Sequence, residues 1–496
     1  MSALAPAPAL RLRALNAAVP RSTGRYVLYW MVANRRTQAN YALQHALYEA
    51  EQRGLPLVVL EALRLDYPHA SPRFHRFVCD GMIDQRDAFA AAGLRYHPYV
   101  EPSVGAGRGL LAAWAAEAAL VITDDWPGGF GPAMQRRAAA RLDLPLIAVD
   151  SVGLVPLAAT DREYTTAHSF RRALHKLLPP LLGEWPLPAP LAGLRSPPPP
   201  VPPAGLLAAW PEAELDALVA DPAALAALPL PRGVAPVALR GGSKAALARW
   251  TSFLADGVER YDTDRSEPDR AGGTGLSPYL HFGQISGQQM VADLMAQGGW
   301  TPARLGAPTG SRAGWWGLSA PVESLLDELV TWRELAQHSA ARQPGWDRYE
   351  TLPDWARLTL AEHAGDPRPT RYSPAQLEAA ATHDPLWNAA QRQLVREGRM
   401  HNYMRMLWGK KVLEWCASPE EAFALLLHLN DKYALDGRDP SSVAGVSWVF
   451  GRFDRAWGPE RAIFGKIRYM SSDNTARKLE VKAYLRQYGQ QAPLLR

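Results

Sequence analysis

Short apolar runs alternate with longer helix-like stretches over the first 150 residues of the chain. The runs lie at residues 26–32, 56–60, 94–100, 120–123 and 146–149. Their lengths and their apolar or β-branched composition favour buried strands. Strands that are separated by helices, as at residues 38–52 and 73–92, are typical of a parallel sheet with crossover connections. We therefore predict a five-stranded, Rossmann-like α/β domain over residues 22–181, with a ligand crevice at the carboxyl ends of its strands.

The pattern changes twice after residue 181. Residues 182–240 include the string SPPPPVPP, which continues neither a helix nor a central strand, so we interpret this stretch as an interdomain linker. From residue 241 the apolar positions recur at helical spacing almost to the end. Asp384 followed by Pro385 is the N-cap and first-turn pattern of a helix start. We predict an all-α domain over residues 241–490.

Composition narrows the class of protein. Hydrophobic residues make up 47% of the chain and charged residues 21%, as in globular proteins, and no apolar run is long enough to span a bilayer. The first 22 residues have no compact apolar block, and we interpret them as a leader rather than a secretory signal. Two cysteines, Cys79 and Cys416, exclude a disulfide framework or a cysteine-built metal site. We expect a cytoplasmic protein.

Charge and tryptophan are both concentrated in the second half. Residues 451–496 carry ten Lys or Arg and four Asp or Glu, whereas the whole chain has a net charge of only +5. Such a basic end would attract a phosphate backbone, although a solvated helical surface explains the charge equally well. Twelve of the 17 tryptophans follow residue 240, a loading that core filling alone does not explain.

Residues 274–286 read TGLSPYLHFGQIS, which we interpret as a loop that enters a helix. The hydroxyl groups of Thr274 and Ser277 beside free backbone N–H groups would suit a phosphate. A helix N-cap explains the same residues without any ligand. The residues by themselves leave both interpretations open.

The string LSPYLHFGQIS nevertheless resembles the flavin-binding region of the photolyase/cryptochrome family. Four further strings resemble the class II cyclobutane pyrimidine dimer photolyases of that family: DPLWNAAQ at 384–391, MHNYMRMLWGKKVLEW at 400–415, LNDKYALDGRDP at 429–440 and IFGKIRYM at 463–470. The resemblance covers nearly all of the predicted helical domain and, more weakly, the first domain.

The resemblance implies a carbon–carbon lyase that repairs cyclobutane pyrimidine dimers in DNA by light. An electron would pass from excited, reduced FAD to a dimer flipped out of the duplex. It also implies that Arg405 and Asp436 pair beside the isoalloxazine and that Asn430 approaches flavin N5. The full set of implied flavin contacts is Tyr261, Thr274, Leu276, Ser277, Arg405, Asn430 and Asp436. A second, antenna chromophore (a deazaflavin or a folate) is left open.

Two groups of aromatic and polar residues carry further implied roles. Glu328 and Trp332 are four residues apart and share one helix face. The resemblance places them in a lesion pocket with Met406, Trp448 and Trp457, where the carboxylate would hydrogen-bond the dimer. Core packing is the ordinary role of any one of these tryptophans.

Three more tryptophans are implied in electron transfer. Trp408 and Trp415 are seven residues apart, so they share a helix face at an axial offset of about 10 Å. Trp387 begins the preceding predicted helix and would pack across from Trp408. By resemblance, Trp387 and Trp408 carry electrons to an oxidised flavin, with Trp415 as a branch.

The chain departs from the family pattern near the implied site. Asn402 and Tyr403 stand where Gly and Phe are usual, Ser441 and Ser442 replace Asn-Gly, and Ser471 replaces Asn. Because of these changes, two other functions stay open: a photolyase that acts on another photoproduct, and a cryptochrome-like blue-light sensor. A nucleotide-binding α/β module explains only the first domain. We expect damaged DNA as the partner, a monomer without an obligate protein partner, and no metal site.

Overall fold

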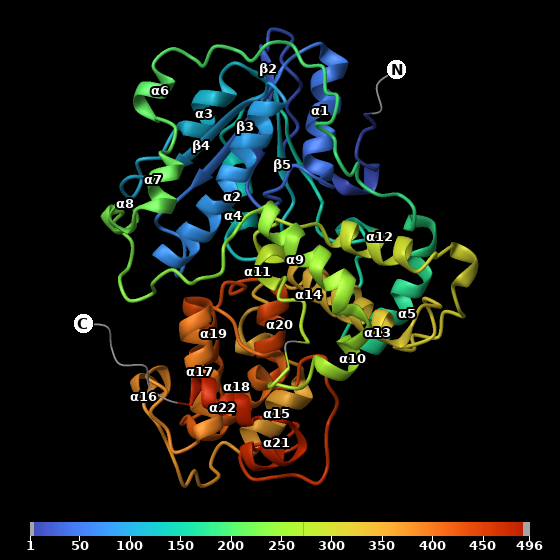
Figure 1. Ribbon diagram of the computed structural model, residues 1–496, viewed down its shortest axis with the longest axis vertical. Coiled ribbons are helices and arrows are strands. Elements are labelled where there is room, and N and C mark those ends of the chain that lie inside the picture. Colours follow the sequence, from blue (N-terminus) through green and yellow to red (C-terminus); the bar gives the residue numbers. More distant parts are fainter. Residues whose placement is uncertain (1–3, 271, 490–496) are drawn as a thin grey trace. The chain divides into compact units, whose positions relative to one another are not determined.

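The computed structural model describes residues 4–270 and 272–489 and divides them into two compact units (Figure 1). The first, here called the sheet unit, contains the described residues up to Asp161 together with Leu177–Thr251 and Leu276–Trp300. The second, the helical unit, contains Arg162–Lys176, Ser252–Gly275 and the described residues from Thr301 onward. This α/β sheet followed by a largely helical region is the predicted fold class.

The sheet has six strands in the order β1-β6-β5-β2-β3-β4. Its parallel strands are β2 (Tyr26–Met31), β3 (Leu57–Leu63), β4 (Arg95–Val100), β5 (Ala118–Asp124) and β6 (Leu146–Val149), which confirms the five predicted runs. The sixth strand, β1 (Leu12–Ala14), is antiparallel to β6. It lies in the segment that we interpreted as a leader, so that interpretation is wrong for these residues.

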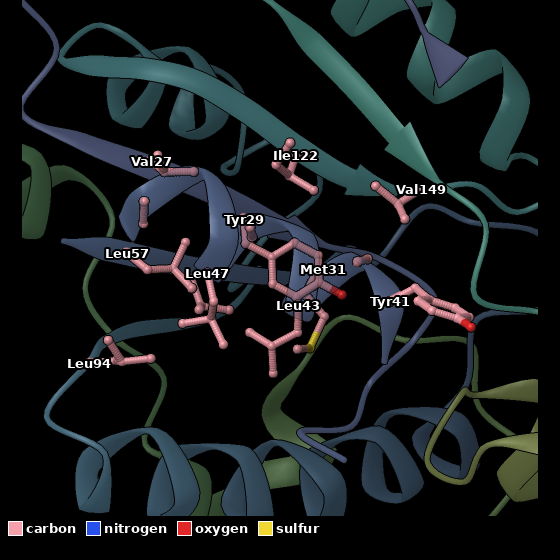
Figure 2. Close-up of a cluster of buried hydrophobic side chains, with 14 of the residues drawn as sticks. Val27, Tyr29, Met31, Tyr41, Leu43, Leu47, Leu57, Leu94, Ile122 and Val149 are labelled. Carbon is pink, nitrogen blue, oxygen red and sulfur yellow. The ribbon is translucent and has the colours of Figure 1, made fainter. Parts of the chain in front are cut away.

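Alternation along β2 divides the core of the sheet unit in two. Tyr29 and Met31 point toward one face, where helix α1 (Tyr41–Arg53) contributes Leu43 and Leu47 (Figure 2). Tyr26, Leu28 and Trp30 pack on the opposite face with Trp114 of α3 (Leu110–Ala115). Asn40 begins α1 by accepting hydrogen bonds from the N–H groups of Ala42 and Leu43. Helices α2 (Pro72–Ala91) and α4 (Gly131–Ala139) complete the crossovers.

The proline-rich stretch forms three short helices, α6 (Leu206–Ala209), α7 (Leu215–Ala220) and α8 (Pro222–Ala227). Helix α7 packs against α2. The stretch ends at Gly241, whose N–H donates to the Asp80 carboxylate at 3.0 Å. A Cβ at Gly241 would lie 2.0 Å from the carbonyl oxygen of Phe77, so only glycine allows this close approach to α2. Helices α9 (Ser243–Asp256), α11 (Ser277–His281) and α12 (Gly287–Gln297) follow.

The helical unit is built around four helices that pack on one another: α17 (Pro385–Glu397), α18 (Asn402–Trp415), α19 (Pro419–Tyr433) and α20 (Pro440–Val449). Asp384 caps α17 and Pro385 is its first residue, as predicted. The other helices of this unit are α5 (Ala167–Leu177), α10 (Tyr261–Asp264), α13 (Ala320–Leu326), α14 (Arg333–Arg342), α15 (Asp354–Glu362), α16 (Pro374–Glu378), α21 (Ser472–Lys478) and α22 (Lys482–Tyr488). Within the described ranges no helix is long and apolar enough to cross a membrane.

Candidate functional site

Arg405 and Asp436, which the sequence predicts to pair, lie together in the helical unit. Arg405 is in the first turn of α18, and Asp436 is in the loop between α19 and α20. Nη2 of Arg405 lies 3.2 Å from Oδ1 and 3.5 Å from Oδ2 of Asp436. The pair is mostly buried, with 20% and 11% of the two side chains exposed. These long contacts leave guanidinium N–H groups able to bond a further acceptor.

Asn430 lies near the C-terminal end of α19 and is 1% exposed. Its Nδ2 is 2.9 Å from Oδ1 of Asp431 and 2.9 Å from Oγ of Ser442. The same Asp431 oxygen accepts the backbone N–H of Arg438 at 2.8 Å, which closes the loop before α20. The carboxamide of Asn430 is therefore fixed by hydrogen bonds to its own helix and to α20.

One face of helix α20 is open at Gly445. Ser441, Gly445 and Trp448 recur at helical spacing on this face, and Arg468 and Lys410 contact the Trp448 ring. A Cβ at Gly445 would meet no atom of the described residues within 4 Å. The buried Oγ of Ser441 has no hydrogen-bond partner in the same set of residues. A face of this kind has room and polar capacity for a bound group.

The predicted pocket residue Glu328 lies in η6 (Asp327–Trp332), a π-helical turn that follows α13. Trp332 ends the same turn. In a π-helical turn, residues four apart still lie on one side, so the predicted shared face holds despite the altered geometry. Such turns occur frequently at functional sites, where they redirect side chains.

Glu328 is bound by Arg265, a residue that sequence reasoning missed. Nη1 of Arg265 lies 2.6 Å from Oε1 of Glu328, and the Arg265 guanidinium carbon lies 5.5 Å from the centre of the Tyr261 ring. Burial raises the pKa of Glu328, and the charge of Arg265 opposes that shift. Burial, with the Glu328 charge as a smaller cause, raises the pKa of Tyr261 to about 12. Tyr261, Arg265 and Glu328 thus form one cluster.

The predicted pocket tryptophans Trp448 and Trp457 are joined by Arg468. The Arg468 guanidinium carbon lies 5.3 Å from the centre of the Trp448 ring and 4.0 Å from that of Trp457. Asp454 holds this arrangement, because it accepts from Nε of Arg468 at 3.1 Å and from Nε1 of Trp457 at 3.2 Å. A guanidinium is planar and positively charged, and it therefore stacks well on tryptophan rings. No sequence spacing pointed to Arg468 or Asp454.

A buried lysine lies beneath the same tryptophan. Nζ of Lys410, in α18, donates to the carbonyl oxygen of Val449 at 2.5 Å and lies 5.0 Å from the centre of the Trp448 ring. Burial lowers the pKa of Lys410 to about 7. Met406, one turn earlier on α18, is partly exposed. Met406 and Trp448 thus lie on two helices, α18 and α20, that pack on each other.

Comparison with known proteins identifies the family. The chain is 36% identical over 480 residues to a deoxyribodipyrimidine photo-lyase of Methanothermobacter thermautotrophicus, a match that covers 96% of this chain and 97% of that protein. It is 35% identical to the deoxyribodipyrimidine photo-lyase of Oryza sativa subsp. japonica, over 92% of this chain and 86% of that protein. The chain belongs to the deoxyribodipyrimidine photo-lyase family.

A solved structure has the same fold. A bacterial class III photolyase from Agrobacterium tumefaciens matches with a TM-score of 0.67 over 94% of this chain and 86% of that one, at 17% identity. No protein-family model matches the chain.

The three tryptophans that the resemblance implies in electron transfer lie on α17 and α18. Nε1 of Trp387 donates to the backbone oxygen of Trp408 at 3.0 Å, and Nε1 of Trp408 donates to Oε1 of Gln391 at 2.9 Å. Trp387, Trp408 and Trp415 are each at most 2% exposed. The rings of Trp387 and Trp415 lie 5.4 Å apart, centre to centre. The structure therefore brings the three predicted residues together.

The aromatic series continues to a residue that the sequence did not suggest. Tyr372 is partly exposed, and its ring lies 5.2 Å from that of Trp415. The Tyr372 hydroxyl pairs with Nδ1 of His383 at 2.5 Å. Aromatic contacts therefore connect the buried tryptophans with the partly exposed phenol ring of Tyr372.

The predicted phosphate contacts fall on both sides of a unit boundary. Leu276 and Ser277 belong to the sheet unit, where Ser277 is the first residue of α11, and Thr274 belongs to the helical unit. Leu276 occupies the N-cap position and supplies no side-chain cap, so the N-cap interpretation of Thr274 and Ser277 is wrong. No group of three or more His, Cys, Asp or Glu side chains in residues 4–270 and 272–489 is arranged to hold a metal ion.

Proposed function

We propose that this protein repairs cyclobutane pyrimidine dimers in DNA, using light and a bound, reduced FAD. The observation that carries the proposal is the near full-length similarity to deoxyribodipyrimidine photo-lyases, at 36% identity over 96% of the chain. Within the helical unit, the buried Arg405–Asp436 pair and the fixed carboxamide of Asn430 support a flavin site.

The polar groups of the helical unit suit a flavin. The Arg405 guanidinium and the Oδ1 atom of Asn430 offer one cationic donor and one acceptor, and Gly445, an open position, lies on the same helix as Ser442. Tyr261, Thr274, Leu276, Ser277 and Asp436 complete the set that we assign to FAD. When bound, the flavin supplies light absorption and the electron that opens the cyclobutane ring.

Arg405 and Asp436 serve the flavin site through charge. A reduced, anionic ring is stabilised by a nearby cation, and the Arg405 guanidinium supplies one. Asp436 holds the guanidinium in place and partly neutralises its positive charge. Since both side chains are mostly buried, little water screens this interaction.

Glu328, Trp332, Met406, Trp448 and Trp457 are assigned to the lesion. Photolyases are among the enzymes known to flip their target out of the duplex, so their pocket needs aromatic walls and a few polar contacts. Trp448 and Trp457 supply aromatic surface that Arg468 fixes. Glu328 supplies a polar contact for the dimer, and Arg265 holds its carboxyl group in place.

The tryptophans of α17 and α18 are assigned to electron supply. Trp408, Trp387 and Trp415 are buried, hydrogen-bonded and in contact with one another, which suits electron exchange with little structural change. We assign them to the reduction of oxidised flavin, which prepares the enzyme for repair.

Finer features complete the proposal. The protein acts on UV-damaged DNA as a monomer in the cytoplasm, without an obligate protein partner. A second, antenna chromophore of the deazaflavin or folate type is left open. Size-exclusion chromatography with light scattering and the absorption spectrum of pigment released by denaturation test these two features.

Repair of a defined substrate tests the main proposal. Purified, reduced protein is incubated with an oligonucleotide that carries one cyclobutane thymine dimer, in blue light and in darkness. Light-dependent restoration of the two thymines is the expected result. Bound, reduced FAD without restoration would contradict dimer repair and favour another photoproduct or a light-sensor role.

A further inference from the structure

Ser442 binds the carboxamide of Asn430 from the neighbouring helix. Its Oγ lies 2.9 Å from Nδ2 and 3.2 Å from Oδ1 of Asn430. Both side chains are buried, with exposures of 4% for Ser442 and 1% for Asn430. The family pattern that this chain resembles has glycine at the position of Ser442, and glycine has no hydroxyl group to make this contact.

Asp431 determines which end of the Asn430 carboxamide is the nitrogen. A carboxylate oxygen only accepts hydrogen bonds, so the group 2.9 Å from Oδ1 of Asp431 is the NH2 group of Asn430. That NH2 group has two hydrogens. Asp431 takes one of them and Ser442 Oγ takes the other. The Ser442 hydroxyl also lies 3.2 Å from Oδ1, and the second lone pair of that carbonyl oxygen is left to accept from a further donor.

We infer that Ser442 is a positioning residue of the flavin site. It holds Asn430 so that the carboxamide oxygen is presented to an N–H donor. Reduced flavin carries an N–H group at N5, whereas oxidised flavin has none there. Ser442 therefore favours the reduced flavin over the oxidised one. This inference rests on the proposed function and on the contact with flavin N5 that the family resemblance implies for Asn430.

The hydroxyl of Ser442 is not needed to start α20. Asp439 caps that helix by accepting the N–H of Ser441 at 2.8 Å. Removal of the Ser442 hydroxyl therefore leaves the cap intact and leaves one N–H of Asn430 buried without an acceptor. A buried donor that lacks its acceptor is unfavourable, so the carboxamide shifts away from this position.

The midpoint potential of the bound flavin tests the inference. In Ser442→Ala, we expect the ratio of reduced to oxidised flavin at a fixed potential to fall by up to about tenfold, a shift of about 30 mV to more negative values for a two-electron couple. Ser447→Ala is the matched control, because it removes a buried hydroxyl from the same helix that has no hydrogen-bond partner in the described residues. A shift in Ser442→Ala no larger than that of the control overturns the inference.

A second comparison separates an effect through Asn430 from a structural effect of Ser442. Addition of Ser442→Ala to Asn430→Ala should leave the potential of Asn430→Ala unchanged, because the mediating carboxamide is already gone. A further shift of the same size as in the parent protein would mean that Ser442 acts without Asn430, and would overturn the inference.

These measurements distinguish failure of the inference from failure of the proposed function. Parent protein that repairs dimers and has the same potential as Ser442→Ala overturns only the role of Ser442. A potential that depends on Ser442 through Asn430, in a protein without repair activity, supports the role of Ser442 and contradicts dimer repair. Parent protein that binds no flavin overturns both.

Discussion

Nη1 of Arg265 lies 2.6 Å from Oε1 of Glu328, so the carboxyl group assigned to the lesion already has a cationic partner. About a third of the Glu328 side chain is exposed, and a quarter of that of Arg265. Burial raises the pKa of Glu328 although Arg265 lowers it. A pyrimidine dimer that binds Glu328 must therefore share this carboxyl group with Arg265 or replace the arginine.

Glu328→Gln tests the role of this carboxyl group. Glutamine keeps the shape of the side chain but cannot form the ion pair with Arg265. We expect the repair yield per absorbed photon to fall severalfold, while the flavin remains bound in the same amount. Repair of a dimer-containing oligonucleotide by reduced enzyme gives the yield, and the flavin absorbance gives the occupancy.

Glu362→Gln is the matched control for this prediction, because Glu362 is an exposed carboxylate at the end of α15. It should repair as well as the parent protein. A repair yield of Glu328→Gln equal to that of the control would contradict the assignment of Glu328 to the lesion.

The architecture follows from local patterns to a large extent. Five apolar runs predicted the parallel strands, because a strand that is buried on both faces consists mostly of apolar residues. Strand β1 has only three residues, with none buried, so no apolar pattern marks it. Asp384 and Pro385 marked the start of α17 because capping is a local interaction.

The site was predictable only in part. Arg405 and Asp436 are 31 residues apart, and their pairing followed from the family resemblance rather than from spacing. Arg265 and Glu328 are 63 residues apart, and Arg468 contacts Trp448 and Trp457 through tertiary packing. Contacts between distant segments leave no periodic trace in the sequence. The π-helical turn at Glu328 was likewise invisible, because its residues also fit an ordinary helix.

Trp408→Phe tests the electron route. Phenylalanine fills most of the volume but is much harder to oxidise than an indole, and it loses the hydrogen bond to Gln391. We expect photoreduction of oxidised flavin to slow at least tenfold, whereas repair by chemically reduced enzyme stays within about twofold of the parent. Absorbance under blue light follows the flavin.

Trp355→Phe serves as the control, since Trp355 lies in α15, outside the contacts that connect Trp387, Trp408 and Trp415. Its photoreduction rate should match that of the parent. A normal rate in Trp408→Phe would show that electrons reach the flavin by another path.

DNA affinity should depend on salt and on Arg455. Arg455 is exposed, and its guanidinium carbon lies 4.4 Å from the centre of the Trp457 ring. Each phosphate that a protein neutralises adds about −0.9 to the slope of log affinity against log salt for duplex DNA. Arg455→Gln should therefore make the slope less steep by about one, as measured by fluorescence anisotropy over a salt series. Lys244→Gln is the control: it removes an exposed cation of the sheet unit and should leave the slope unchanged. If the slope of Arg455→Gln were also unchanged, Arg455 would not contact a phosphate.

Lys410 should make stability depend on pH in a defined direction. Its amine is buried, its pKa is lowered to about 7 by burial, and it faces Asp454, Arg468 and the Trp448 ring. Below pH 7 the lysine is charged in both states, so the full cost of burying the charge is present. Between pH 7 and the model-peptide value of about 10.4, the unfolded chain holds a proton that the folded chain has lost, so the stability of the parent rises with pH.

Lys410→Met removes this titration and keeps the length of the side chain. The free energy of unfolding of Lys410→Met minus that of the parent should therefore be largest at or below pH 7 and should fall by about 2 kcal/mol between pH 7 and pH 9. Urea unfolding of the full-length proteins at both pH values gives this difference. Lys482→Met, at an exposed lysine of α22, should show no such change. A difference for Lys410→Met that is independent of pH would mean that the amine stays charged in the folded protein, held by Asp454 and the Trp448 ring.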